Sequence, residues 1–172
     1  SYVYSSLLPV EAMGEDNLIV PKHRALPQGY DWKDLSRFKG IVHIPYCPST
    51  MSIFENYTSS IPMFLPSYKF MLSLRSAYGK NGVLNQMSWR EVNNLKPGSI
   101  VPFDNKNNTI TDINNYGNID DEKEWIKLSD FYDEEWMPFI QYFDSFSYLK
   151  HLVRTANTQE ISDNMRDFNK IR

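Results

Sequence analysis

The clearest pattern of hydrophobic and polar positions lies between residues 40 and 79. The run "GIVHIPY" (40–46) is almost continuously apolar and is bounded by Gly and Pro, which is typical of a buried strand. The segment 49–60 that follows has helical spacing. It begins with Ser49 and Thr50, and either side chain is a natural N-cap.

A second unit of the same kind follows at once. Residues 61–67 ("IPMFLPS") predict another short buried strand. Residues 67–79 predict a helix that is capped by Ser67 and ends at Gly79. Strand, helix, strand and helix with short connections between them predict strands that run parallel.

The flanking regions are less regular. Before residue 40, short apolar runs alternate with turn-forming residues, and one short helix is predicted over 32–38. Residues 80–120 are polar, with a short helix predicted over 88–95 and a long loop over 103–121.

The last third of the chain has helical patterns. Four helices are predicted there, over residues 121–132, 137–143, 144–155 and 158–171. Asp144 or Ser145 is the expected cap of the third. The whole pattern predicts one α/β domain. Residues 1–120 would form a Rossmann-like parallel sheet flanked by helices, with the helices of 121–172 packed on it.

Composition and charge argue against several classes of protein. The chain has 172 residues, which is enough for one domain with a core, and a net charge of -3, which argues against a nucleic-acid binder. Cys47 is the only cysteine, so no disulfide can form within the chain and a cytoplasmic location is expected. No apolar run approaches the ~20 residues of a transmembrane helix, so no transmembrane segment is expected.

The segment from Pro45 to Thr50 is the best candidate for an anion site. A strand that leads into a helix capped by Ser or Thr places backbone amides and the positive end of the helix dipole at one opening. In open α/β sheets, ligands bind outside the carboxyl ends of the strands. The hydroxyl groups and amides of Ser49 and Thr50 are therefore expected to face a phosphate.

The string "IPYCPSTMSIFENYTSSIPMFLP" (44–66) resembles the donor-binding signature in the C-terminal lobe of GT-B glycosyltransferases. That signature has a strand, a short loop, a helix with an apolar residue before a glutamate, and a proline seven residues later. Phe54-Glu55 and Pro62 match this spacing. The resemblance implies that Glu55 binds the ribose of a nucleotide-sugar donor, with Ser49 and Thr50 at its diphosphate.

The sequence also departs from this family pattern. Many retaining members have another glutamate eight positions earlier, where this chain has Cys47. The usual Gly-Phe-Gly segment is replaced by residues 48–50, Pro-Ser-Thr, and the small residues before Pro62 are Ser59 and Ser60, with no glycine. The pattern is therefore that of a divergent relative, and no catalytic residue is assigned. The resemblance covers roughly residues 30 to 78.

Four other residues are candidates for donor binding. Lys22 and Arg24 belong to a basic cluster in a proline-bounded loop, where they could clamp a diphosphate, although plain surface charge is the simpler interpretation. Tyr46 could stack on a base or only pack. Lys69 follows a predicted strand, at the same edge of the sheet, or lies on an exposed helix face.

Other chemistry is not favoured. His43 lies inside a predicted buried strand, so a core histidine is favoured over a catalytic base. No set of cysteines and histidines has the spacing of a metal site, so neither a metal nor a cofactor is expected.

The resemblance also implies partners. Besides the nucleotide-sugar donor, a glycan or another acceptor is expected, and an N-terminal lobe outside this chain would complete the enzyme. The start at Ser1, which is not a methionine, fits a fragment.

Two alternatives remain open. The first is a non-catalytic α/β interaction domain that docks through its aromatic C-terminal segment, 130–146. The second, a sulfotransferase-like protein, would need a phosphate loop rich in Gly and Lys that this sequence lacks.

Overall fold

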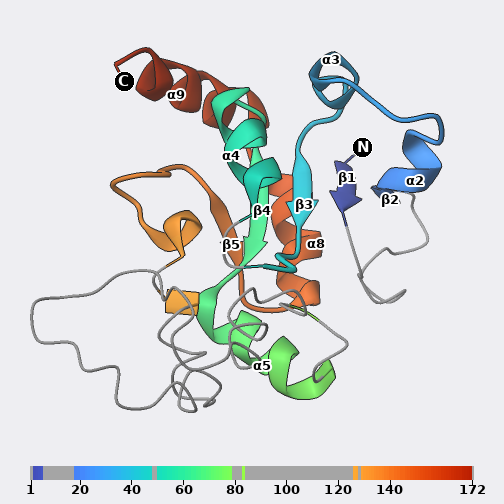
Figure 1. Ribbon diagram of the computed structural model, residues 1–172, viewed down its shortest axis with the longest axis vertical. Helices are drawn as coiled ribbons and strands as arrows, with labels where there is room; N and C mark the ends of the chain where they lie inside the picture. Colours follow the sequence, from blue (N-terminus) through green and yellow to red (C-terminus); the bar gives the residue numbers. More distant parts are fainter. Residues whose placement is uncertain are drawn as a thin grey trace, which may run out of the picture.

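The chain folds around a parallel β-sheet (Figure 1). The structure, a computed structural model, describes residues 2–5, 18–47, 50–78, 83, 126–127 and 129–171. The sheet has five strands in the order β2-β1-β3-β4-β5, and every pair of neighbours is parallel. The strands are β1 (Tyr2–Ser5), β2 (Ile19–Pro21), β3 (Ile41–His43), β4 (Met63–Pro66) and β5 (Gln141–Phe143).

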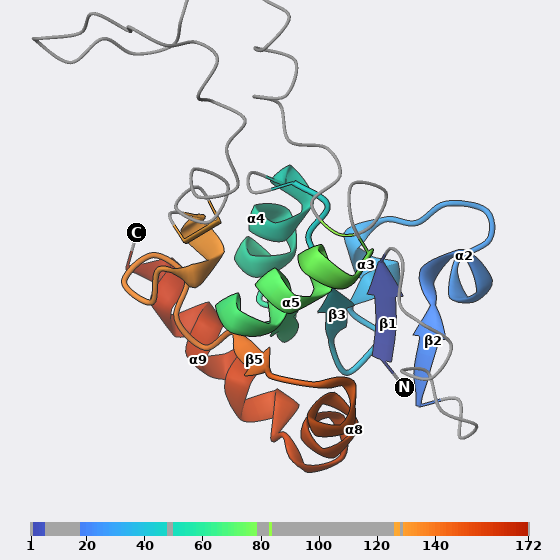
Figure 2. The same cartoon turned by 90° about the horizontal axis from the view of Figure 1, so that it is seen from below.

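Helices lie on both faces of this sheet, which makes the fold α/β. Figure 2 shows α4 on one side of the strands and α8 on the other. The helices are α2 (Lys22–Ala25), α3 (Trp32–Leu35), α4 (Met51–Thr58), α5 (Tyr68–Tyr78), α8 (Phe146–Thr155) and α9 (Thr158–Lys170), with a 3-10 turn, η3 (Asp130–Tyr132), before β5.

β4 shows how the core is divided between the two faces. Its four residues are all buried, and successive side chains point to opposite faces. Met63 and Leu65 join a cluster with Ile53 of α4 and Met165 of α9. Phe64 joins a second cluster, between the sheet and helices α5 and α8. A strand buried on both faces is typical of the interior of a parallel sheet.

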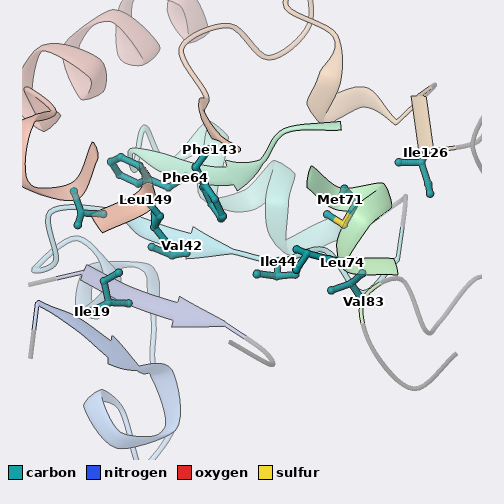
Figure 3. Close-up of a cluster of buried hydrophobic side chains, with 11 residues drawn as sticks. Ile19, Val42, Ile44, Phe64, Met71, Leu74, Val83, Ile126, Phe143 and Leu149 are labelled. Atoms are coloured by element: carbon teal, nitrogen blue, oxygen red, sulfur yellow. The ribbon is translucent and has the colours of Figure 1, made fainter. Parts of the chain in front are cut away.

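The second cluster is the larger one. Phe64 lies near Val42 of β3 and Phe143 of β5, with Leu149 of α8 beside them (Figure 3). Phe70 on α5 packs edge to face against Phe143, with ring centroids 5.9 Å apart. Three strands and two helices therefore meet on this face.

The strand order has one switch point. The chain passes from β1 to β2 on one side and then returns to the other side of β1 to form β3. In sheets of this order, ligands bind at the carboxyl ends of the strands, next to that switch. β3 and the polypeptide that follows it are at this position.

The predicted elements between residues 40 and 78 are confirmed. β3, α4, β4 and α5 occur in that order, and β3 and β4 pair in parallel. Thr50 is the residue before α4, as predicted. The Ser67 hydroxyl accepts a hydrogen bond from the backbone N–H of Phe70 at 3.3 Å, so it caps α5.

The C-terminal region corrects one prediction. The helix predicted over 137–143 is wrong, because residues 141–143 form β5 and pair with β4. A short run of large apolar residues fits either state, and burial against β4 selects the strand. The helices predicted over 144–155 and 158–171 are confirmed as α8 and α9, and Ser145 is the cap of α8.

Other predicted elements are confirmed only in part or lie outside the described residues. The helix predicted over 32–38 is limited to a single turn, α3. Within 121–132, only residues 126–127 and η3 are described in helical conformations. The helix predicted over 88–95 and the loop over 103–121 lie outside the part of the chain that the structure describes.

α9 is tied to the C-terminal end of α4. The side-chain amide of Asn169 donates to the Tyr57 carbonyl at 3.1 Å, and the Ser162 hydroxyl donates to the Ser60 carbonyl at 2.7 Å. Carbonyl groups at the end of a helix have no partner within the helix. Side chains of α9 supply donors at this end, so the two helices act as one layer.

Candidate functional site

Polar side chains follow the carboxyl ends of four strands. Lys22 comes directly after β2, Tyr46 after β3, Ser67 after β4 and Asp144 after β5. The Ser67 hydroxyl donates to the Asp144 carboxylate at 2.5 Å and so links the ends of β4 and β5. The donor site predicted from the sequence would lie at this edge of the sheet.

The loop between β3 and α4 folds back on itself. Thr50 is buried, and its hydroxyl donates to the backbone carbonyl of Cys47 at 2.9 Å. It forms no side-chain cap with the first amides of α4. The Thr50 hydroxyl therefore does not cap α4, and it points to Cys47 instead of the expected phosphate. Ser49, the other predicted contact, lies outside the described residues.

Glu55 lies on the solvent-facing side of α4. Ile53, Asn56 and Tyr57 are the buried residues of this helix, so Glu55 points away from the sheet. It forms no ion pair with any described residue. A carboxylate in this position is accessible to a ligand that approaches from solvent.

A small polar cavity lies on the inner side of α4. Its volume is about 20 Å³ and its polar lining includes Lys22, Tyr30, His43, Ser52 and Asn56. Lys22 Nζ donates to the Tyr30 hydroxyl at 3.0 Å and lies 4.6 Å from the centre of the same ring. Asn56 Oδ1 is buried and accepts no hydrogen bond from a described residue. The cavity has room for about one water molecule and not for a nucleotide.

His43 is a neutral core residue in this structure. It is 2% exposed at the end of β3. Burial, together with the positive charge of Lys22, lowers the pKa of His43 to about 4. A histidine with this pKa carries no charge at neutral pH. The interpretation as a core histidine is therefore supported over that of a catalytic base.

The remaining predicted donor contacts are spread over this side of the molecule. Lys22 is brought beside Ser52 and Asn56 of α4, as the cavity lining shows. Arg24 is exposed on α2, Lys69 is exposed on the first turn of α5, and Tyr46 is 38% exposed. Glu55 does not line the cavity that contains Lys22.

Sequence reasoning missed several polar residues at this edge. Ser52 and Asn56 are four residues apart and so lie on one side of α4. A polar pair at this spacing, beside the apolar positions of a helix, is a usable signal for an inward-facing polar site. The sequence indicates Asp144 only as a helix cap, and nothing local to it indicates its bond to Ser67.

The aromatic segment 130–146 is mostly part of the core. Phe131, Met137 and Phe143 are buried. Burial raises the pKa of Tyr142 well above its usual range, and its hydroxyl donates to the Phe131 carbonyl. Trp136 differs, because it is 60% exposed.

Trp136 borders a groove of about 600 Å³. The groove runs between α4, α9 and the segment before β5. Its other lining residues are Phe54, Tyr57, Thr58, Asp130, Met137, Phe168 and Asn169.

Within the described residues, no group of three or more His, Cys, Asp or Glu side chains is placed to hold a metal ion. No helix in the same residues combines the length and the apolar character needed to cross a bilayer.

Comparison with known proteins leaves the family of this chain open. No family model matches the sequence, and no curated protein or solved structure is significantly similar to it.

Proposed function

We propose that this chain is the nucleotide-sugar-binding lobe of a two-lobed glycosyltransferase. The observation that carries the proposal is the position of Glu55. It is solvent-exposed on α4, the helix that connects β3 to β4 next to the switch point of the sheet. The resemblance in sequence between residues 44 and 66 assigns the same residue to the ribose of the donor.

The chemistry of such a lobe is electrostatic. As the bond between sugar and diphosphate breaks, negative charge builds up on the leaving diphosphate. Backbone amides at the start of α4 and nearby cations such as Lys69 would stabilise that charge. Glu55 would hold the ribose hydroxyls and fix the position of the donor. The acceptor and the catalytic base would come from the other lobe.

Binding of nucleotides tests this proposal directly. The chain is unfolded thermally with and without UDP, GDP and their sugar derivatives. A ligand at ~100 times its Kd adds about 2.7 kcal/mol to the free energy of unfolding, which is a clear shift in Tm for a domain of this size. We expect one base to give this shift and Glu55→Gln to abolish it.

Glu134→Gln is the matched control. Glu134 is also exposed, but it lies in the turn before β5. It lines neither the small cavity beside Lys22 nor the groove beside Trp136. The control should keep the full shift. If both variants kept it, ribose binding by Glu55 would be excluded.

The second candidate is the interaction domain, and exposure of Trp136 over its groove favours it. The same titration separates the two candidates. If no nucleotide shifts the Tm, and Trp136→Ser changes the sedimentation of the full chain, docking through the aromatic segment becomes the better account.

A further inference from the structure

A pocket of about 490 Å³ lies at the opposite edge of the sheet, beyond the amino ends of β3 and β4. Figure 1 shows α3, the end of α4 and the start of α9 gathered on this side. The pocket is lined by residues 36–39, by residues 59–62 and by the first turns of α9. Its volume falls in the range of small-molecule sites, about 300–1,000 Å³.

Positive charge dominates the lining. Arg37, Lys39 and Arg166 contribute to it, and no carboxylate does. Arg166 pairs with Asp163 at 2.8 Å, and Arg37 lies 3.5 Å from Asp34 at the rim. Within the described residues, Lys39 has no ion-pair partner. Lys39 is therefore available to bind an added anion, whereas the two arginines are shared with the carboxylates of Asp34 and Asp163.

Neutral donors converge on the same space. Thr158 and Gln159 begin α9, a helix of thirteen residues, so the positive end of its dipole lies on this side. The Glu160 amide is already bonded to the Asn157 side chain, and the Glu160 carboxylate offsets part of this dipole. Ser59 and Ser60 line the other side. Ser60 has a φ of 56° and its carbonyl is held by Ser162, so this side is fixed before a ligand arrives.

We propose that this pocket binds a phosphate group, carried by a soluble phosphate ester or by a lipid headgroup. Phosphate fits because arginine presents its donors in a planar fork that matches phosphate oxygens, with lysine as an added point charge. The site is separate from the proposed donor site, because its residues lie at the other edge of the sheet.

The test uses the full chain at constant ionic strength. Inorganic phosphate and glucose 6-phosphate are titrated while the backbone amide signals of Ser59, Ser60 and Gln159 are followed by NMR. Vesicles of phosphatidylcholine with and without phosphatidic acid form a separate arm, measured by co-sedimentation. We expect saturable binding in at least one arm, with the amide signals changing for a soluble ligand.

Charge variants then locate the site. Lys39→Gln and Arg166→Gln should each weaken binding about tenfold, the loss expected for one charge-assisted contact. Asp163→Asn should strengthen binding, because it releases Arg166 from its ion pair. Lys170→Gln is the matched control, since it removes a similar pair with Asp167 on the same helix, at 2.9 Å, outside the pocket.

Each outcome decides the proposal. Binding to inorganic phosphate or glucose 6-phosphate supports the site and indicates a soluble phosphate ester. Binding only to vesicles with phosphatidic acid supports the site and indicates a lipid headgroup. Absence of binding in every arm overturns it. Equal weakening by Lys170→Gln and Arg166→Gln also overturns it, because the effect would then be one of net charge. Glu55→Gln should leave phosphate binding unchanged, so this result stands apart from the nucleotide test.

Discussion

The two edges of the sheet differ in the open space that lies beside their polar groups. At the carboxyl edge, polar side chains bind one another or the backbone, as Ser67 does with Asp144 and Thr50 with Cys47, and the cavity beside Lys22 and His43 measures only about 20 Å³. At the amino edge, cations surround a hollow of about 490 Å³. The edge where α/β folds usually bind ligands therefore has little open space in the described residues, whereas the other edge holds an open pocket.

The largest expected effect is a loss of folding stability at low pH, caused by protonation of His43 at the carboxyl edge. The pKa of His43 falls from 6.5 in the unfolded chain to about 4 in the folded one, so between these values the unfolded chain binds more protons. The stability linked to His43 is fully present above pH 6.5 and is lost as the pH falls toward 4. The full loss is about 3 kcal/mol, to be measured by urea unfolding at a series of pH values.

His43→Leu isolates this effect. Carboxylates also titrate near pH 4, but they do so in both proteins, so the difference between the two profiles belongs to His43. The variant should lose less stability than the wild type between pH 6.5 and 4. His23→Gln, at an exposed position, should follow the wild type. Parallel profiles for His43→Leu and the wild type would contradict the buried neutral histidine.

The next effect tests the amino edge, where two segments of backbone touch. A Cβ at Gly40 would lie 2.7 Å from the Pro62 carbonyl oxygen, which also accepts the Ile41 N–H at 2.8 Å. Gly40→Ala must push these segments apart, so we expect it to cost about 2 kcal/mol in the free energy of unfolding.

Gly29→Ala is the comparison for Gly40→Ala. Gly29 has a φ of +88° and no atom within 4 Å of the added Cβ, so only backbone strain opposes the change. Its cost should be about 1 kcal/mol. Equal costs for the two variants in urea unfolding would mean that the contact between Gly40 and Pro62 relaxes freely.

The smallest effect concerns the link between α9 and α4. Asn169→Ala removes the donor to the Tyr57 carbonyl and should cost about 1 kcal/mol. Asn164→Ala, at an exposed position of the same helix, should be close to neutral. If thermal unfolding placed the two variants at the same Tm, the link would be dispensable and the pocket beside it less rigid than described.

The segment from β3 to α5 was predictable because its signals are local. Gly40, Pro45 and Pro62 delimit strands, and Ser67 caps a helix, each through its own backbone chemistry. β5 has no such signal. Its three residues form a strand because β4 offers unpaired backbone groups beside them, and that neighbour is 77 positions away along the chain.

The same contrast applies to the sites. The position of Glu55 on a helix after a strand follows from spacing alone, and the structure places it there. The amino-edge pocket combines residues 36–39, 59–62 and 158–166, and each stretch looks like ordinary polar surface by itself. Only tertiary packing brings them together. The hydrogen bond from the Thr50 hydroxyl to the Cys47 carbonyl takes the place of an expected phosphate contact, and the sequence does not predict it either.

The late position of β5 in the chain has a consequence for biosynthesis. The two largest buried clusters contain residues from beyond position 139: Phe143 and Leu149 in one, Ile140 and Met165 in the other. Until the ribosome has released these residues, a nascent chain exposes part of both faces and one edge of β4. Closing so long a loop slows folding, and exposed strands invite aggregation. We therefore expect the unfinished chain to depend on chaperones until its last two helices have emerged.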